Sequence, residues 1–276
     1  MKIEDSDFYR LKNYIYENFG INLEKKRTLV EGRLVNAIPV AGFDNFHDYI
    51  EDILGDKSGR KVDQLITKLT TNYTYFMREE AHYNFMASSA LQEWKKKICD
   101  YDLRIWSAGC SSGEEAYTAA MVLDNYFGAD KRQWDTTILA TDISPHVLRL
   151  AKEGIYPRNH LEKLPEVWVR RYFNKLPNDR WEVKDTLKRE VVFREFNLMR
   201  DFNQFRRKFH IIFCRNVMIY FDKPTKAGLV KKFYDALEPG GYLFIGLSET
   251  LSGLFDGFYQ VAPAIYKKVV VNHGSR

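Results

Sequence analysis

The feature that most constrains the fold is a short apolar run that ends in a glycine- and serine-rich turn and then opens a predicted helix. This stretch, LRIWSAGCSSGEEAY, spans residues 103–117. A parallel strand that ends in such a turn lets the backbone approach a ligand closely, because glycine has no Cβ and tolerates positive φ. The helix that follows offers N–H groups that have no partner within the helix. The stretch therefore predicts a strand, a ligand-binding turn and a helix.

The residues of this turn restrict the chemistry of the ligand. The phosphate-binding patterns G-x-G-x-x-G and G-x-x-x-x-G-K-[ST] are absent, and the carboxylates of Glu114 and Glu115 would repel phosphate. We therefore expect a ligand with positive charge or hydroxyl groups, and S-adenosylmethionine, with its sulfonium, ammonium and ribose diol, fits. On these residues alone, an ordinary strand-to-helix turn with solvated glutamates is an equally good interpretation.

Strands and helices alternate along much of the chain that follows. The predicted elements are strands at 103–108, 137–142, 209–214 and 241–247 and helices at 114–127, 145–153 and 224–237. Such alternation predicts a mainly parallel α/β sheet. The final run, FYQVAPAIYKKVVV, predicts one or two further strands, broken near Pro263, that supply an antiparallel edge pair.

The interval between the helix at 145–153 and the strand at 209–214 is too long for a simple crossover. Within it, RWEVK at 180–184 and EVVFREF at 190–196 predict two strands joined by a turn. We interpret the region at about 172–196 as a small antiparallel β-subdomain inserted in the sheet domain.

The edge of this subdomain has two interpretations. An exposed edge strand would suit strand addition by an extended peptide. Alternatively, Lys184, Lys188 and Arg189 protect the edge against pairing, which is the more common role of such charges.

A small all-α domain is predicted at the N-terminus, over residues 1–72. Amphipathic spacing indicates helices at 7–19, 24–38, 46–54 and 61–69. The second of these carries a basic stretch made of Lys25, Lys26, Arg27 and Arg33. The stretch would suit an acidic helix of a partner protein, although a solvated helix face is the more frequent role of such charges.

A polar segment joins the two domains. Residues 70–80, TTNYTYFMREE, follow the last predicted helix without a glycine or proline and are unusually rich in threonine and asparagine. We interpret residues 73–98 as a linker segment and a helix, the latter at 81–97. The sheet domain then occupies residues 99–276.

Composition argues against several classes of protein. The formal net charge of +5 is modest for 276 residues, so nucleic-acid binding is not expected, whereas an acidic protein partner is allowed. The three cysteines, Cys99, Cys110 and Cys214, lack metal-ligand spacing, so no metal site is expected. No apolar run approaches the ~18 residues that span a bilayer, and the acidic N-terminus is unlike a secretory signal. A cytoplasmic protein without membrane insertion is expected.

Two further strand ends carry polar residues that suit a ligand. Asp142 ends the strand at 137–142, where an acidic residue accepts hydrogen bonds from ribose hydroxyls in nucleotide-binding sheets. As a helix N-cap it would need no such role. Arg215 and Asn216 follow the strand at 209–214. Because ligands bind outside the carboxyl ends of strands in open α/β sheets, these residues and the glycine turn are expected to converge on one crevice.

Four motifs, in this order and spacing, carry a resemblance: TTNYTYFMRE, WSAGCSSGEEAY, ATDIS and FCRNVMIYFDK. Together they closely resemble the chemotaxis receptor glutamate O-methyltransferases, the CheR family, over nearly the whole chain. The resemblance implies a class I, Rossmann-like methyltransferase sheet with S-adenosylmethionine as methyl donor. It also implies methylation of glutamate γ-carboxylates on chemoreceptor helices. One departure is Ala116, where the family usually has proline.

The resemblance also assigns roles to residues. Cofactor contacts are implied for Asn72, Thr74, Arg78, Glu115, Asp142, Asn197, Leu198, Arg215 and Asn216, and contacts with the substrate carboxylate for Arg78 and Tyr220. Some relatives bind a receptor tail peptide at the β-subdomain. Without the resemblance, Tyr220 would be interpreted as a core aromatic beside Phe221.

Two alternative functions remain open from the sequence. The chain would be a regulatory module that binds S-adenosylmethionine without turnover, or a methyltransferase for small carboxylates. The presence of Arg78 and Tyr220 argues against the first alternative, and the helical domain with its basic stretch argues against the second.

Overall fold

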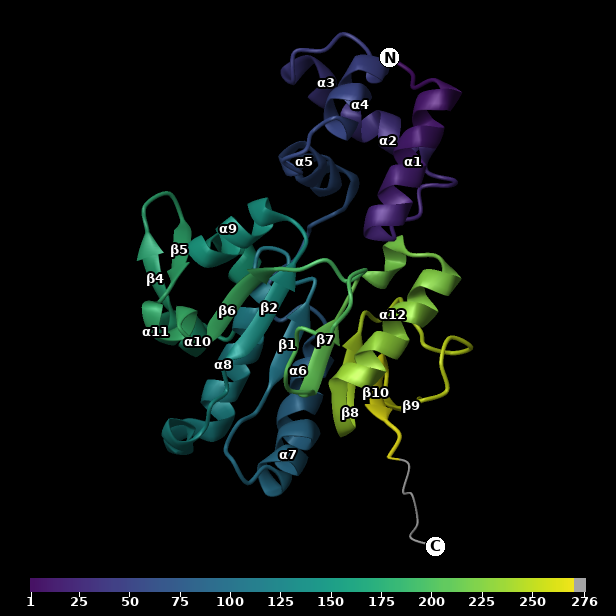
Figure 1. The fold of residues 1–276 in the computed structure, drawn as a ribbon. Coiled ribbons are helices and arrows are strands. Elements are labelled where there is room, and N and C mark those ends of the chain that lie inside the picture. Colours follow the sequence, from purple (N-terminus) through teal and green to yellow (C-terminus); the bar gives the residue numbers. More distant parts are fainter. Residues whose placement is uncertain (271–276) are drawn as a thin grey trace, which may run out of the picture.

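The computed structural model describes residues 1–270 and shows a helical lobe stacked on a larger sheet domain (Figure 1). The lobe consists of α1 (Asp5–Phe19), α2 (Arg27–Leu34), α3 (Ala37–Val40), α4 (Phe46–Leu54) and α5 (Arg60–Leu69). Apolar residues at helical spacing build its core, among them Leu11, Val30, Ile50 and Leu65. The predicted all-α domain is therefore confirmed.

The second predicted helix, at 24–38, is wrong at both ends. Residues 24–26 form a turn in which the Glu24 amide is held by the Asn22 side chain at 2.8 Å, so α2 begins only at Arg27. The helix ends at Leu34, and Pro39 lies inside the separate short helix α3 rather than at a helix end. Side-chain and turn contacts outweigh helical periodicity here.

The main sheet has seven strands in the order β6-β2-β1-β7-β8-β10-β9. They are β1 (Ile105–Ala108), β2 (Ile138–Asp142), β6 (Val191–Glu195), β7 (Phe209–Cys214), β8 (Leu237–Ile245), β9 (Phe258–Ala262) and β10 (Ile265–Lys268). Pairing is parallel from β6 to β8, and β10 is antiparallel to both β8 and β9. The predicted parallel sheet with an antiparallel edge pair is confirmed, although the last predicted strand residue, Val271, lies outside the described residues.

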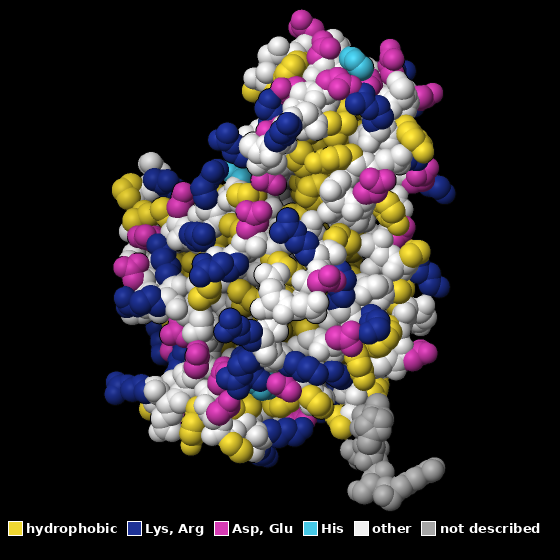
Figure 2. Space-filling view, in the orientation of Figure 1, with side chains coloured by type: hydrophobic (Ala, Val, Ile, Leu, Met, Phe, Trp, Pro, Cys, Tyr) yellow, Lys and Arg dark blue, Asp and Glu magenta, His cyan; other side chains and the backbone are white. Residues whose placement is uncertain are grey.

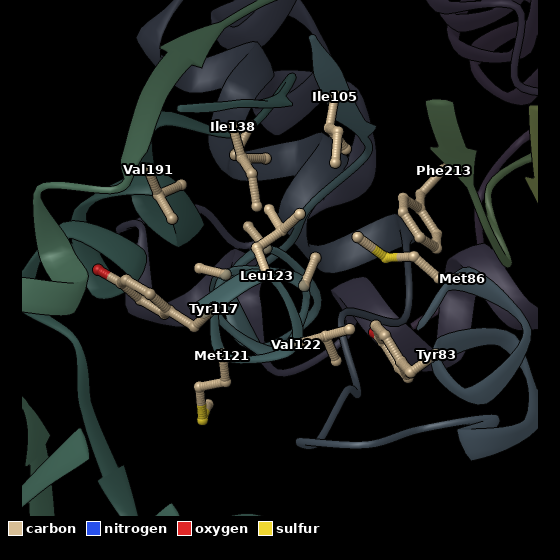
Figure 3. Close-up of a cluster of buried hydrophobic side chains, with 14 of the residues drawn as sticks. Tyr83, Met86, Ile105, Tyr117, Met121, Val122, Leu123, Ile138, Val191 and Phe213 are labelled. Carbon is tan, nitrogen blue, oxygen red and sulfur yellow. The ribbon is translucent and has the colours of Figure 1, made fainter. Parts of the chain in front are cut away.

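Helices cover both faces of this sheet. One face carries α6 (Glu80–Phe85), the π-helical turn η1 (Met86–Ala90), α7 (Leu91–Lys97) and α8 (Glu114–Phe127), and the other carries α12 (Lys223–Ala236). In Figure 3, Tyr117 and Leu123 of α8 face Ile138 and Val191 of the strands. Successive side chains of a strand point to opposite faces of the sheet, so each strand contributes to both hydrophobic cores. Ile105, for example, lies in one core and its neighbour Trp106 in the other.

A second, three-stranded antiparallel sheet is inserted after α9 (Pro145–Glu153). Its strands β3 (Ile155–Pro157), β5 (Arg180–Val183) and β4 (Phe173–Leu176) pair in the order β3-β5-β4. The helices α10 (Glu166–Tyr172) and α11 (Asp185–Lys188) and the 3-10 turn η3 (Arg158–Leu161) complete it. Two further 3-10 turns are η2 (Gly128–Gln133) and η4 (Met218–Tyr220).

The predicted strand at 190–196 does not belong to this small sheet. It forms β6, which pairs in parallel with β2 from Ile138–Val191 to Asp142–Glu195 at the edge of the main sheet. Its alternate residues Val191 and Phe193 are buried against α8, so the strand is needed to complete the main core. The sequence pattern specifies an extended segment with one buried face but not its partner.

Candidate active site

The carboxyl ends of β1, β2 and β7 open into one cavity beneath the helical lobe. Chain order reverses between β1 and β7, which makes this the switch point of the sheet, where ligands bind. The empty space at this site is about 1010 Å³, open solvent at its mouth included. All the predicted site residues line this cavity: Asn72, Thr74, Arg78, Glu115, Asp142, Asn197, Leu198, Arg215, Asn216 and Tyr220.

The glycine turn after β1 is held by the neighbouring strands. The amides of Gly109 and Cys110 both donate to the Thr141 carbonyl at the end of β2, at 2.8 and 2.9 Å. Gly109 has φ +89°, and a Cβ there would lie 2.4 Å from the Val217 side chain. Only glycine therefore allows this turn to pack against the loop after β7.

The two glutamates of the turn point to different places. Glu115 lies in the cavity wall, where it accepts hydrogen bonds from Ser107 at 2.7 Å and from Arg215 at 3.2 Å. Glu114 is fully buried and meets His160 at 2.9 Å and Ser112 at 2.7 Å. Glu115 therefore faces the ligand space, whereas Glu114 joins the turn to the inserted subdomain.

Asp142 is fastened at both carboxylate oxygens. One accepts the Ser111 amide at 2.9 Å and the other the Ser144 amide at 3.0 Å. The N-cap of α9 is Ser144, not Asp142, since the Ser144 hydroxyl accepts the Val147 amide. Burial raises the pKa of Asp142, and these backbone bonds offset part of that shift. Each oxygen keeps a lone pair for a hydroxyl donor in the cavity.

Arg215 is the hub of the site, with a side chain only 2% exposed. Its guanidinium donates to Glu79 at 3.1 Å, to Tyr83 at 3.0 Å, to Glu115 and to the Arg78 carbonyl. Burial alone would lower the pKa of Arg215, but the surrounding acidic groups raise it overall. Burial likewise raises the pKa of Glu115, and Arg215 opposes that shift. Removing either partner would leave a buried charge without its counter-charge.

The linker contributes Asn72 and Thr74 from an irregular segment and Arg78 from the turn at 76–79, whose geometry is strained. Met77 and Glu79, on either side of Arg78, have φ of +59° and +56°, a region that side chains rarely adopt. Arg78 Nη1 donates to the Tyr73 carbonyl at 2.9 Å. Backbone strain of this kind persists only where surrounding contacts hold the residues in place, and such residues are often found at functional sites.

Tyr220 fastens the linker to the sheet domain. Its hydroxyl accepts the Thr71 amide at 2.9 Å and donates to the Thr71 carbonyl at 3.3 Å. The alternative interpretation of Tyr220 as a core aromatic holds only in part. The ring packs against the core of the helical lobe, but the hydroxyl reaches the linker. Asn197 plays a comparable part, since its amide donates to the Asn18 carbonyl at 2.8 Å.

A second cavity adjoins the first on the side of α2. It shares Arg78, Asn216 and Tyr220 with the first cavity, and Lys26 and Arg33 line its basic wall. The Lys26 ammonium lies 5.6 Å from the centre of the Tyr220 ring. Burial lowers the pKa of Lys26, as do the positive charges of Arg33 and Lys226. An anion would therefore be stabilised in this outer cavity.

Charges on the face of the molecule drawn in Figure 2 are mixed. In Figure 2, Lys and Arg side chains are interspersed with Asp and Glu on the face shown, and neither sign forms a continuous field. Within residues 1–270, His, Cys, Asp and Glu side chains form no group of three or more that could hold a metal ion. No helix in the same range is both long and apolar enough to cross a membrane.

The sequence analysis assigned no role to Glu79 or Glu249, and it considered Glu114 only as a charge of the glycine turn. Glu79 pairs with Arg215, and Glu249, after β8, accepts backbone amides of the loop after β7. The rule that ligand sites lie beyond the carboxyl ends of strands would have pointed to the residues after β8 as well. No comparable pattern indicates the contact between Glu114 and His160.

The donor set suits S-adenosylmethionine. Glu115 is placed to attract a cation, Asp142 has free lone pairs for ribose hydroxyls, and the neighbouring walls include Phe196, Leu198 and Val217. The fold and the cavity thus define a class: a Rossmann-like domain that binds a cationic nucleoside at the switch point of its sheet.

Comparison with known proteins identifies the family. Residues 72–266 match the CheR methyltransferase SAM-binding domain, and residues 6–70 match the CheR methyltransferase all-alpha domain. A chemotaxis protein methyltransferase of Borreliella burgdorferi is 44% identical over 272 residues, which cover 97% of this chain and 96% of the relative. That of Escherichia coli is 34% identical over 270 residues, covering 96% and 92%. The chain therefore belongs to the CheR methyltransferase family.

This membership makes the chain an enzyme that uses S-adenosylmethionine as its methyl donor. The predicted fold class, a class I methyltransferase sheet with an inserted antiparallel subdomain and an N-terminal all-α domain, is confirmed.

Proposed function

We propose that this protein transfers a methyl group from S-adenosylmethionine to the γ-carboxylate of specific glutamates on the cytoplasmic helices of chemoreceptors. The products are glutamyl methyl esters and S-adenosylhomocysteine. The observation that carries the proposal is the pair of adjoining cavities that share Arg78, Asn216 and Tyr220. The inner cavity contains carboxylates suited to a cationic donor, and the outer one contains cations suited to an anionic acceptor. The names of the relatives, chemotaxis protein methyltransferases, support a receptor as substrate.

The chemistry asks mainly for placement. S-adenosylmethionine supplies an electrophilic methyl group on a sulfonium; the S–CH₃ bond breaks as the bond from the acceptor oxygen forms. A glutamate carboxylate is ionised near neutral pH, so the protein does not have to remove a proton. Holding the two reactants in line contributes on the order of 7–11 kcal/mol in favourable cases.

Arg78 is proposed to hold the acceptor carboxylate where the two cavities share lining residues. Its bond to the Tyr73 carbonyl fixes one end of the guanidinium and leaves other N–H groups free to donate. A charge-assisted bond to one carboxylate oxygen contributes roughly 1.5–3 kcal/mol. The second oxygen then remains available to attack the methyl group.

Tyr220 is proposed to orient that carboxylate. Its hydroxyl can rotate its O–H away from the 3.3 Å contact with the Thr71 carbonyl and toward the acceptor. The 2.9 Å bond from the Thr71 amide to the same oxygen is kept during this rotation. One side chain can therefore fasten the linker and still donate to the substrate.

The outer cavity is proposed to receive the receptor helix. Its basic residues, Lys26 and Arg33, would attract acidic side chains, and the partly exposed Leu29 and Ile219 would contact apolar ones. Of the basic stretch, Arg27 is less suited to this role, because it is bound to Asp5 and to the Ile3 carbonyl.

A receptor tail peptide is proposed to bind the small sheet by strand addition. Two residues of its outer strand β4, Asn174 and Lys175, are exposed. Lys184 does not shield this edge, since its ammonium donates to the carbonyls of Arg170 and Arg171. The backbone of β4 therefore offers the groups that strand addition needs.

The decisive experiment is incubation of the protein with methyl-labelled S-adenosylmethionine and chemoreceptor-containing membranes from the same organism. We expect label on the receptor that mild base releases, as a carboxyl methyl ester requires. Binding of S-adenosylmethionine without any transfer would favour the regulatory module. Transfer to small carboxylates but not to receptor would favour the small-molecule methyltransferase.

A further inference from the structure

A turn after β8, at residues 246–249, contacts both segments that carry the proposed catalytic side chains. The Glu249 amide closes the turn by donating to the Gly246 carbonyl at 2.9 Å. The Glu249 carboxylate then accepts three backbone amides: Gly246 at 2.6 Å, Asn216 at 3.0 Å and Ile219 at 3.1 Å. One side chain thus fixes the start and the end of the loop that precedes Tyr220.

The loop held in this way has a demanding conformation. Asn216 has φ +59°, in the left-handed region that residues other than glycine seldom occupy. Asn216 and Tyr220 line both cavities, so the backbone between them sets where donor and acceptor sides meet. A strained loop of this kind needs external contacts to persist.

The same turn reaches the linker. The Leu247 amide donates to Glu79 at 3.2 Å, and the Glu79 carboxylate pairs with Arg215. Glu79 follows Arg78 directly and has a positive φ as well. The turn therefore connects the segment of Arg78 with that of Tyr220.

The approach of the turn to the loop is too close for a side chain at position 246. A Cβ on Gly246 would lie 2.5 Å from the side-chain nitrogen Nδ2 of Asn216 and 2.9 Å from the backbone nitrogen of the same residue. It would also lie 2.9 Å from the Glu249 carboxylate. Glycine is thus required for the carboxylate to reach the loop.

We propose that Glu249 is a positioning residue for methyl transfer, which acts through the loop of Asn216 and Tyr220. Glu249 is not among the residues that line either cavity. This inference rests on the proposed function, since it assumes that Tyr220 orients the acceptor carboxylate. Its effect should therefore appear in the rate of transfer more than in the affinity for either reactant.

The first test is Glu249→Gln. A glutamine offers one acceptor oxygen, and its NH₂ group would face a backbone N–H, so at least one of the three bonds is lost. We expect kcat for receptor methylation to fall about 10- to 100-fold, the range that a small misplacement of a reacting group produces. The KM for receptor should change little, and calorimetry should show that S-adenosylmethionine still binds.

The second test is a double-mutant cycle with Tyr220→Phe. If Glu249 acts through Tyr220, the double variant should be about as slow as the slower single variant, because the hydroxyl is already misplaced when Glu249 is changed. Multiplicative losses in kcat would mean that Glu249 acts independently of Tyr220 and would overturn the proposal. Gly246→Ala, which displaces the carboxylate without removing it, should give the same pattern. If Glu249→Gln does not bind S-adenosylmethionine, Gly246→Ala takes its place in the cycle.

Glu153→Gln, on an exposed position at the end of α9, is the matched control and should keep wild-type kcat. Wild-type transfer together with an unchanged kcat in Glu249→Gln would overturn this inference alone. A wild-type protein that methylates no receptor would overturn the proposed function and this inference with it.

Discussion

Two walls of the site differ in how they are built. The proposed donor wall comprises Asp142 and Arg215 at the ends of β2 and β7 and Glu115 in the first turn of α8, and each of these side chains is bound by other groups of the chain. The proposed acceptor wall, comprising Tyr73, Arg78 and Tyr220, lies on the linker and a loop, and Tyr73 is 65% exposed. A preorganised wall suits one small cofactor, whereas an open wall admits a protein helix.

The strongest expected effect is on the acceptor wall. Arg78→Ala should lower kcat for receptor methylation by about 100-fold or more, because a misplaced acceptor loses most of the benefit of alignment. Transfer of labelled methyl groups to receptor membranes measures it. Arg206→Ala, an exposed arginine beyond the site, should retain normal rates. Near-normal turnover of Arg78→Ala would remove this residue from the mechanism.

Asp142→Asn tests the donor wall. The amide would turn one N–H toward a backbone N–H and would lose the charge that accepts ribose hydroxyls. Bonds to charged groups contribute about 1.5–3 kcal/mol, so the Kd for S-adenosylmethionine should rise roughly 10- to 100-fold. Calorimetry measures it, with the exposed Asp256→Asn as control. An unchanged Kd would show that Asp142 only shapes the turn.

Lowering the pH should weaken the binding of S-adenosylmethionine at the donor wall. Burial raises the pKa of Glu115 and of Asp142, so both carboxylates take up protons at a higher pH than exposed ones. A cationic ligand binds the ionised forms, so affinity for S-adenosylmethionine should fall as pH falls, by up to about tenfold per unit for each proton taken up. Calorimetry from about pH 8 to pH 5 tests this, and Asp142→Asn should flatten the profile. A flat wild-type profile would contradict it.

Tyr220→Phe should have a smaller effect than Arg78→Ala. The ring stays, but the hydroxyl that accepts the Thr71 amide is lost, which leaves that amide without its partner. We expect kcat to fall about tenfold, equivalent to about 1.4 kcal/mol, while S-adenosylmethionine binds nearly as before. Steady-state kinetics with receptor membranes decides between this outcome and an unaffected rate, which would make Tyr220 a structural residue.

The smallest expected effect concerns capture of the receptor. Lys26→Glu should raise the KM for receptor several-fold at low salt, because it places a negative charge in the basic wall of the outer cavity. The difference should shrink as salt is added, and the Kd for S-adenosylmethionine should not change. Lys57→Glu, exposed on the same lobe, is the control. Equal KM values would return Lys26 to an ordinary surface charge.

The donor wall was more accessible to sequence reasoning than the acceptor wall. Asp142 ends a recognisable strand and Glu115 and Arg215 come after two others, and parallel strands bring their carboxyl ends to one edge. The resemblance added Arg78 and Tyr220, whose roles no local pattern reveals. Two features that depend on tertiary contacts were not predicted. One is the pairing of β6 with β2. The other is the hydrogen bond that the Glu249 carboxylate accepts from the Asn216 amide, 33 residues away in the chain.

The helical lobe is bonded directly to the loops around the site. Asn18 accepts the Asn197 amide, Tyr16 bonds Asp222, and Ile21 forms a strand-like bridge with Phe221. The lobe therefore cannot be exchanged between relatives as an independent cassette. A chimaera that takes its lobe from one relative and its sheet domain from another would have to match both sides of these contacts. If the lobe captures the receptor, as proposed, a change in the lobe that alters capture also acts on the loops of the proposed site through these contacts.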